Sequence, residues 1–206
     1  PGSPMDWTAY PITAMSNPLG TLNPLALAEV GGRPAIAFTV PDGFENSIYY
    51  AYPNSSEPQS ENDWDYEEVY KNAFPFSFHN SLDLVEDDGN PLMSLRDSTE
   101  DAARIFRGQT ADPPSGNWDS LTVLGGGGAG YPSKLVLDSQ GRPALAIMRD
   151  DTSQLWFAHA TQPQPTESGH WQIMYISPRG GTELDIAERP GGGFAIAWRT
   201  SNGNIY

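Results

Sequence analysis

A short motif built around glycine occurs four times along the chain, and this internal repeat constrains the fold more than any other feature. The copies are GRPAIAF (32–38), GNPLMSL (89–95), GRPALAI (141–147) and GGFAIAW (192–198). Another short apolar run precedes each copy, at PLALAEV, SLDLVED, SKLVLDS and TELDIAE. Alternating small and large apolar residues predict strands, and glycine suits the positive-φ position of a tight turn. Each pair of runs therefore predicts a β-hairpin.

Two further runs extend the repeat to four strands. Aromatic and β-branched residues follow each hairpin, at SIYYAYP, ARIFRGQ, QLWFAHA and NIY, and a fourth run begins at Trp64, Trp118 and Trp171. These tryptophans are 54 and 53 residues apart, and the glycines at 32, 89 and 141 are 57 and 52 residues apart. Four strands within such a period predict one blade of a β-propeller.

We expect one all-β propeller domain over residues 5–206, with four blades of four antiparallel strands at about residues 24–71, 81–125, 133–178 and 182–206. The fourth repeat reaches its third strand at Tyr206, whereas MDWTAYPIT (5–13) is a fourth strand without a repeat of its own. Residues 5–13 are therefore expected to close the last blade and remove an exposed edge. Closure within one chain is favoured over reciprocal strand exchange between two chains. Residues 1–4 (PGSP) resemble a cloning remnant.

The whole repeat unit resembles the blade repeats of bacterial sialidase-like β-propellers. The unit runs through an apolar strand, an acidic residue, Gly-Arg-Pro, Ala-Ile-Ala, an aromatic strand ending in Ala, and Trp, and the resemblance extends from Trp7 to Tyr206. It implies the fold and no particular activity, because such propellers include lectins, scaffolds and enzymes. The sequence has no Asp-box of the Ser-x-Asp-x-Gly-x-Thr-Trp kind and no assignable arginine triad, so sialidase activity is not implied.

The charge and the apolar content of the chain exclude some classes of binding partner. With 11 Lys and Arg against 26 Asp and Glu, the net charge is -15, which disfavours nucleic acids and anionic membranes. No apolar run approaches the roughly 20 residues of a membrane span, so no membrane insertion is expected. A soluble protein is predicted, cytoplasmic if Met5 is the native start and extracellular if a leader was removed.

Residues that recur in the repeats are interpreted as structural. Trp7, Trp64, Trp118 and Trp171 occupy equivalent places, where they are expected to pack between blades. An acidic residue also recurs before each glycine turn and is expected to accept backbone N–H bonds there, namely Glu29, Glu86, Asp138 and Glu188.

Charged residues on the innermost strands raise the question of a cation site. Asp83, Lys134 and Asp185 are expected to face the central channel, where two carboxylates would suit a hard cation. The sequence has no compact calcium loop, and His79, His159 and His170 lack zinc-site spacing. There is also no cysteine to supply a thiolate. No metal or other cofactor is therefore predicted.

The candidate binding surface follows from propeller topology. Loops joining strand 2 to strand 3 and loops joining strand 4 to the next strand 1 emerge on one face, which we call the loop face. Its expected site residues are Phe74, Phe76, Phe78, His79, Tyr131, Arg179, Asp97, Asp150 and Asp151. Aromatic rings beside polar groups at the mouth of a ring are typical of a ligand or protein contact.

These features favour a non-catalytic binding or scaffold propeller that recognises a protein or a glycan through the loop face, as a monomer. An enzyme is the less favoured interpretation, because no Gly-x-Ser-x-Gly elbow or other catalytic set is evident. Three alternatives stay open. They are a lectin with repeated inter-blade pockets, a glycan-active hydrolase using channel carboxylates, and half of a larger strand-exchanged dimeric ring.

Overall fold

The computed structural model describes residues 24–42, 45–72, 81–114 and 116–206, which form three four-stranded antiparallel sheets and one two-stranded sheet. The first sheet contains β1 (Leu25–Val30), β2 (Arg33–Asp42), β3 (Glu45–Pro53) and β4 (Trp64–Asn72). The second contains β5 (Asp83–Asp87), β6 (Asn90–Asp97), β7 (Ala102–Gly108) and β8 (Trp118–Gly125). The third contains β9 (Ala129–Leu137), β10 (Pro143–Arg149), β11 (Gln154–Ala160) and β12 (Trp171–Ser177), and the fourth contains β13 (Glu183–Glu188) and β14 (Phe194–Arg199). Short 3-10 turns precede β4 and β12, at Glu61–Asp63 and Ser168–His170.

The predicted hairpins are confirmed, and tight turns explain their glycines. In the first hairpin Gly31 and Gly32 have φ of 55° and 76°, and in the second Asp88 and Gly89 have φ of 53° and 78°. Two successive residues with positive φ make the turn whose twist matches antiparallel strands. The residues before these turns pair directly with those after them, as Val30 with Arg33.

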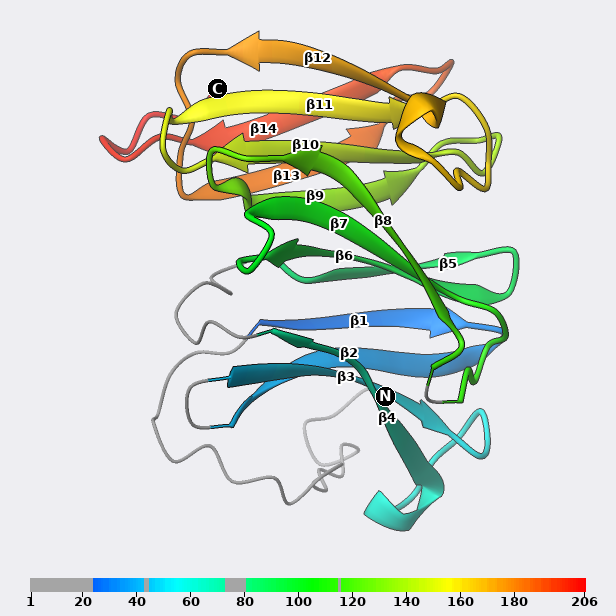
Figure 1. Ribbon diagram of the computed structural model, residues 1–206. Helices are drawn as coiled ribbons and strands as arrows, with labels where there is room; N and C mark the ends of the chain where they lie inside the picture. Colours follow the sequence, from blue (N-terminus) through cyan, green and yellow to red (C-terminus); the bar gives the residue numbers. More distant parts are fainter. Residues whose placement is uncertain (1–23, 43–44, 73–80, 115) are drawn as a thin grey trace, which may run out of the picture.

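The sheets radiate from a common axis. β1 contacts β5, β5 contacts β9, and β9 contacts β13, so the first strand of every sheet lies innermost. Figure 1 shows the sheets in chain order, from the blue first sheet at the bottom to the orange and red strands at the top. This all-β arrangement, with four-stranded sheets meeting at their inner strands, is that of a β-propeller.

Apolar side chains fill the seams between neighbouring sheets. At the first seam, the small Ala35 and Ala37 of β2 pack against Leu84, Met93 and Leu95 of the second sheet, and all five are buried. Small residues on one side allow close approach to large ones on the other, which gives dense packing. The tryptophan prediction holds for Trp118, which packs edge-on against Tyr50 across the first seam, and for Trp171, which lies in the core cluster between the second and third sheets. Trp64 is buried.

The last sheet is described only through two strands and one further bridge. β13 pairs with β14, and Arg199 of β14 forms an isolated bridge with Ile205. The segment expected to close this blade, residues 5–13, lies outside the described residues. The number of blades and the route of closure therefore stay predictions.

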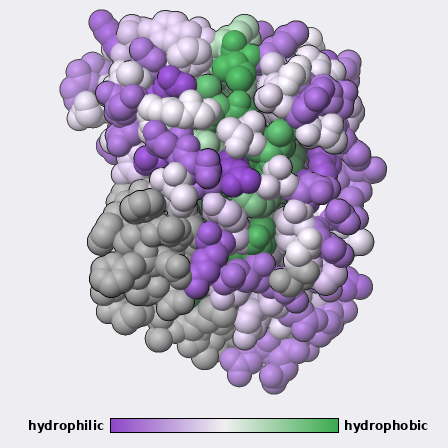
Figure 2. Space-filling model, in the orientation of Figure 1, coloured by the Kyte–Doolittle hydropathy of each residue, from purple (hydrophilic) through white to green (hydrophobic). Residues whose placement is uncertain are grey.

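The outer surface is mixed in polarity. In Figure 2 an apolar band begins over β12 and continues over β7 and β8, between polar side chains. In β12 the exposed apolar residues are Ile173, Met174, Tyr175 and Ile176. Among the described residues, no helix has the length and apolar character needed to cross a membrane.

Candidate functional site

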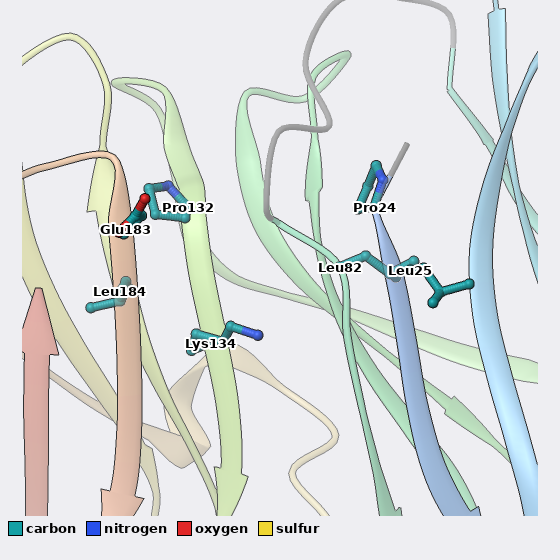
Figure 3. A pocket seen from close by; sticks show the side chains of 7 residues that line it. All are labelled: Pro24, Leu25, Leu82, Pro132, Lys134, Glu183 and Leu184. Carbon is teal, nitrogen blue, oxygen red and sulfur yellow. The ribbon is translucent and has the colours of Figure 1, made fainter. Parts of the chain in front are cut away.

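A pocket of about 270 Å³ lies where the four innermost strands begin, and we call it the axial pocket. Its lining comes from every sheet: Pro24 and Leu25 at β1, Leu82 before β5, Pro132 and Lys134 in β9, and Glu183 and Leu184 in β13. Figure 3 shows Pro24, Leu25 and Leu82 on one side and Pro132, Glu183 and Leu184 on the other, with Lys134 extending from β9 toward Leu82. Apolar side chains thus line the pocket together with a small number of charged groups, as in many ligand sites.

The charge inside this pocket is balanced by Asp83. The Lys134 Nζ lies 3.7 Å from Asp83 Oδ2, and that oxygen also accepts the backbone N–H of Leu135 at 3.0 Å. The other carboxylate oxygen accepts the N–H of Leu84 at 3.2 Å. Burial raises the pKa of Asp83 above its usual value, even though the N–H groups and Lys134 oppose that change. Asp83 therefore joins β5 to β9 and fixes the position of Lys134.

A second, contiguous hollow of about 430 Å³ extends this site along β13 and β14. The two share Lys134, Glu183 and Leu184, and the second adds Asp185 and Arg199. Arg199 Nη2 donates to Glu183 Oε1 at 2.5 Å. Both side chains are about half exposed, so this ion pair can exchange with a hydroxyl-bearing ligand at little cost.

The axial pocket opens beside the loop face, because each inner strand starts directly after a connection on that face. Tyr131 immediately precedes the pocket residue Pro132. The Arg96 guanidinium lies 5.2 Å from the Tyr131 ring centre, and 3.4 Å separates Arg96 from Asp101. The pKa of Tyr131 is raised above its usual value by burial and by the nearby Asp150, and Arg96 opposes this change only in part. The structure thus brings Tyr131 and Asp150 together.

The other expected loop-face residues are placed differently. Asp150 and Asp151 are exposed, and a side chain at Gly127 or Gly128 would collide with them. Asp97, expected among the exposed carboxylates, is instead fully buried, because it accepts hydrogen bonds within its own sheet and from Tyr70 of the first sheet. Arg179 donates to the Tyr206 hydroxyl at 2.8 Å.

Four expected residues lie outside the described residues, namely Phe74, Phe76, Phe78 and His79. Their contribution to the loop face stays a prediction. Among the residues that the structure does describe, we find no group of three or more His, Asp or Glu side chains able to hold a metal ion.

A separate pocket of about 280 Å³ lies at the seam between the second and third sheets. Its lining is mixed, with Ile105, Leu121 and Pro165 beside polar groups from Arg107, Asp119, Ser120, Gln164 and Thr166. At the first seam, Tyr50 occupies the position that Ile105 occupies here, and its hydroxyl donates to the Ala111 carbonyl at 2.9 Å. The larger Tyr50 ring fills space that Ile105 leaves open, so the seams are not equivalent.

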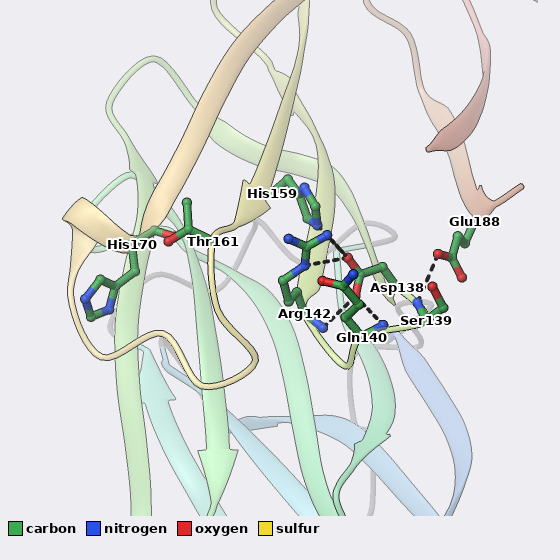
Figure 4. A network of polar contacts seen from close by, with 8 residues as sticks. All are labelled: Asp138, Ser139, Gln140, Arg142, His159, Thr161, His170 and Glu188. Atoms are coloured by element: carbon green, nitrogen blue, oxygen red, sulfur yellow. Dashed lines mark hydrogen bonds and ion pairs between the residues drawn. The ribbon is translucent and has the colours of Figure 1, made fainter. Parts of the chain in front are cut away.

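A polar network stabilises the turn between β9 and β10 (Figure 4). Asp138 accepts the N–H groups of Gln140 and Arg142, the Arg142 guanidinium at 2.7 Å, and a contact from His159 Nε2 at 2.9 Å. Burial alone would raise the pKa of Asp138, but these bonds outweigh it and bring the pKa down to about 2. The expected role of Asp138 as a turn carboxylate is confirmed.

Two of the other predicted turn carboxylates, Glu86 and Glu188, need correction. Strand register aligns Asp87, rather than Glu86, with Asp138, and Asp87 forms an ion pair with Arg107 of β7. Glu188 accepts the N–H of Ser139 at 2.9 Å, so it bonds to the turn of the preceding sheet instead of its own. This carboxylate therefore links two sheets.

Comparison with known proteins identifies the fold. No protein-family model matches the chain, and no curated protein sequence matches it. Among solved structures, an endo-arabinase from Bacteroides thetaiotaomicron is similar with a TM-score of 0.50 and 12% identity, over 86% of this chain and 70% of that one. An engineered GH43 glycoside hydrolase with endo-xylanase and exo-arabinofuranosidase activity has a TM-score of 0.45 and 9% identity. This chain spans 38% of that protein, with 88% of its own length covered. The chain has the all-β propeller fold.

Sequence reasoning identified Lys134 as a channel residue but missed most of the pocket lining. Leu25, Leu82 and Leu184 occupy the same repeat position at the start of an inner strand, as the strand register shows. An apolar residue repeated at that place was the available signal. No sequence pattern predicts that Glu183 lines the pocket, because Glu183 and Lys134 come together only in the folded chain.

Proposed function

We propose that this propeller is a carbohydrate-binding module that takes a neutral oligosaccharide at the axial pocket, entering from the loop face. The observation that carries the proposal is the axial pocket itself, whose lining combines Leu25, Leu82 and Leu184 with Lys134 and Glu183. A sugar ring presents an apolar face and a rim of hydroxyls. The exposed Leu25 can cover the ring face, while the ammonium donates to hydroxyls and the carboxylate accepts from them.

Binding is favoured over hydrolysis by the way the carboxylates are used. Both oxygens of Asp83 accept backbone N–H bonds, and Glu183 is paired with Arg199. A glycosidase of the usual kind needs two carboxyl groups free to transfer protons or attack the sugar. The fold shared with an endo-arabinase is compatible with a glycan ligand.

The test is calorimetric titration with arabino-oligosaccharides, preceded by an array of neutral glycans to select further ligands. We expect Lys134→Met to weaken binding about tenfold or more, since a hydrogen bond from a charged group contributes about 1.5–3 kcal/mol. Lys71→Met, at the other lysine of the chain, is the matched control on the outer strand β4 and should leave affinity unchanged.

Three results would overturn the proposal. Absence of binding to every glycan on the array would indicate a protein partner. Equal loss of affinity in Lys134→Met and Lys71→Met would show that only net charge matters. Release of new reducing ends during the titration would show a hydrolase.

A further inference from the structure

Each seam between sheets is built from the same repeat positions. Five positions on the first two strands of a sheet form the side that packs against the preceding sheet, and we call this side the apolar face. Its members are Leu82, Leu84, Pro91, Met93 and Leu95 in the second sheet, and Ser133, Leu135, Pro143, Leu145 and Ile147 in the third. In the fourth sheet they are Leu184, Ile186, Phe194, Ile196 and Trp198. All of these residues are buried or partly buried.

The first sheet has the same face, and among the residues that the structure describes no sheet precedes it to cover that face. The equivalent residues are Leu25, Leu27, Pro34, Ile36 and Phe38. Leu25 is 68% exposed and Leu27 is 66% exposed, whereas their equivalents Leu82 and Leu84 are each 4% exposed. The apolar side continues outward, because Phe38 stacks on Tyr49 with ring centres 5.7 Å apart.

The opposite end of the chain shows the complementary surface, which we call the alanine face. Ala35 and Ala37 pack against the second sheet, and Ala144 and Ala146 pack in the same way against the fourth. The equivalents in the fourth sheet are Ala195 and Ala197, and both are exposed. The two end sheets thus carry the two halves of one seam.

A hydrogen-bonding pattern repeats at the same place. Asp83 accepts the N–H of the following residue with Oδ1 and the N–H of Leu135, on the next inner strand, with Oδ2. Asp185 is the equivalent of Asp83, and its Oδ1 accepts the N–H of Ile186 at 3.0 Å. The side chain of Asp185 is exposed, so Oδ2 can accept from a further inner strand. The equivalent of Leu135 on β1 is Leu27.

Charge is complementary at the turn as well. Glu188 bonds across the third seam to the turn that follows β9, through Ser139. Glu29 is the equivalent of Glu188 on β1 and is exposed. The turn that follows β13 begins with Arg189, which is also exposed. An acidic residue and a basic residue are therefore placed to meet when the two end faces join.

We propose that the alanine face of β13 and β14 docks on the apolar face of β1 and β2 in a second copy of this chain, head to tail. Two such contacts close a dimer. Each copy contributes four sheets, and eight sheets lie within the four-to-eight range of closed propellers. Asp185 of one copy then accepts the N–H of Leu27 of the other. The contact closes the open side of the axial pocket, which Leu25 and Glu183 border.

Sedimentation velocity over micromolar concentrations tests this contact. We expect a dimer for the wild type, and at least a hundredfold weaker association for Leu27→Glu and for Ala197→Glu, because each buries a carboxylate without a partner. Met174→Glu is the control, since Met174 is 50% exposed on the outer strand β12, and it should remain a dimer. An equimolar mixture of Leu27→Glu and Ala197→Glu retains one native pair of faces, so a heterodimer should form.

A wild-type monomer throughout this range would overturn the proposal, as would a dimer that neither substitution weakens. Hydrogen exchange supplies a readout without any substitution. The Leu27 amide should be protected in concentrated protein and lose protection on dilution, whereas protection independent of concentration would also contradict the contact. Association is measured without glycan, so its outcome is separate from that of the proposed carbohydrate binding.

Discussion

Asp97 offers a sharp test of how the loop face is held in place. Its carboxylate is fully buried and accepts four hydrogen bonds. The donors are the Tyr70 hydroxyl and the Arg104 guanidinium, each at 2.7 Å, and the backbone N–H groups of Thr99 at 2.9 Å and Glu100 at 3.0 Å. Burial would raise the pKa of Asp97, but these bonds outweigh it and hold the pKa below its usual value. Asp97→Ala should therefore destabilise the fold, although the residue was expected to bind a ligand.

The magnitude follows from the partners left behind. Removing one member of a buried ion pair costs about 3–5 kcal/mol in the free energy of unfolding. The Arg104 side chain is 18% exposed and also donates to Ser120 at 2.7 Å, so part of its charge stays solvated. We therefore expect the lower end, about 3 kcal/mol. For a chain of this size, that loss lowers Tm by roughly 6–12 °C.

Urea unfolding followed by tryptophan fluorescence measures this difference. Asp150→Ala is the matched control, because Asp150 is an exposed aspartate on the same face and should change the free energy of unfolding by less than about 0.5 kcal/mol. A loss below about 1 kcal/mol for Asp97→Ala would refute the structural role that its burial indicates.

Two further predictions concern the seams and turns. The pKa of Asp138 is lowered from 3.8 to about 2, so the stability that its carboxylate provides is complete above its usual pKa and lost as the pH falls toward 2. When the free energy of unfolding in urea is measured at decreasing pH, it should therefore fall less for Asp138→Asn than for the wild type. An identical dependence of this free energy on pH in the two proteins would contradict the proposed role of the network. Tyr50→Phe removes the hydroxyl that donates to the Ala111 carbonyl, which should cost about 1 kcal/mol in urea unfolding. An unchanged midpoint would show that this bond contributes nothing at the first seam.

Much of the fold could be predicted from the sequence, because strand alternation and tight turns are local. The runs at 24–30 and 32–38 contain both strands of a hairpin and its glycine turn, and they pair as expected. The prediction of the turn carboxylate in the second repeat was wrong by one residue, because Asp87 and not Glu86 is equivalent to Asp138. The turn after Asp138 is longer than the turn after Asp87, so counting back from the glycine gives a different position in each repeat. In a strand, one residue of shift moves a side chain to the other face.

The site was predictable only in part. Propeller topology led to the loop face, beside which the axial pocket opens, but four strands far apart in sequence line that pocket. Glu183 and Lys134 meet through folding, and no motif links them. The burial of Asp97 likewise depends on Tyr70, which comes from another sheet. Contacts of this kind follow from the arrangement of sheets around the axis and leave no local pattern in the chain.

The central claim is that the axial pocket binds a neutral oligosaccharide. Amide chemical-shift mapping during titration with the tightest-binding glycan of the array tests it most directly. The account predicts the largest shifts at Leu25, Leu82, Lys134, Glu183 and Leu184, because these residues line the pocket. Shifts confined to the seam pocket around Ile105 and Asp119, with the axial residues unmoved, would contradict it.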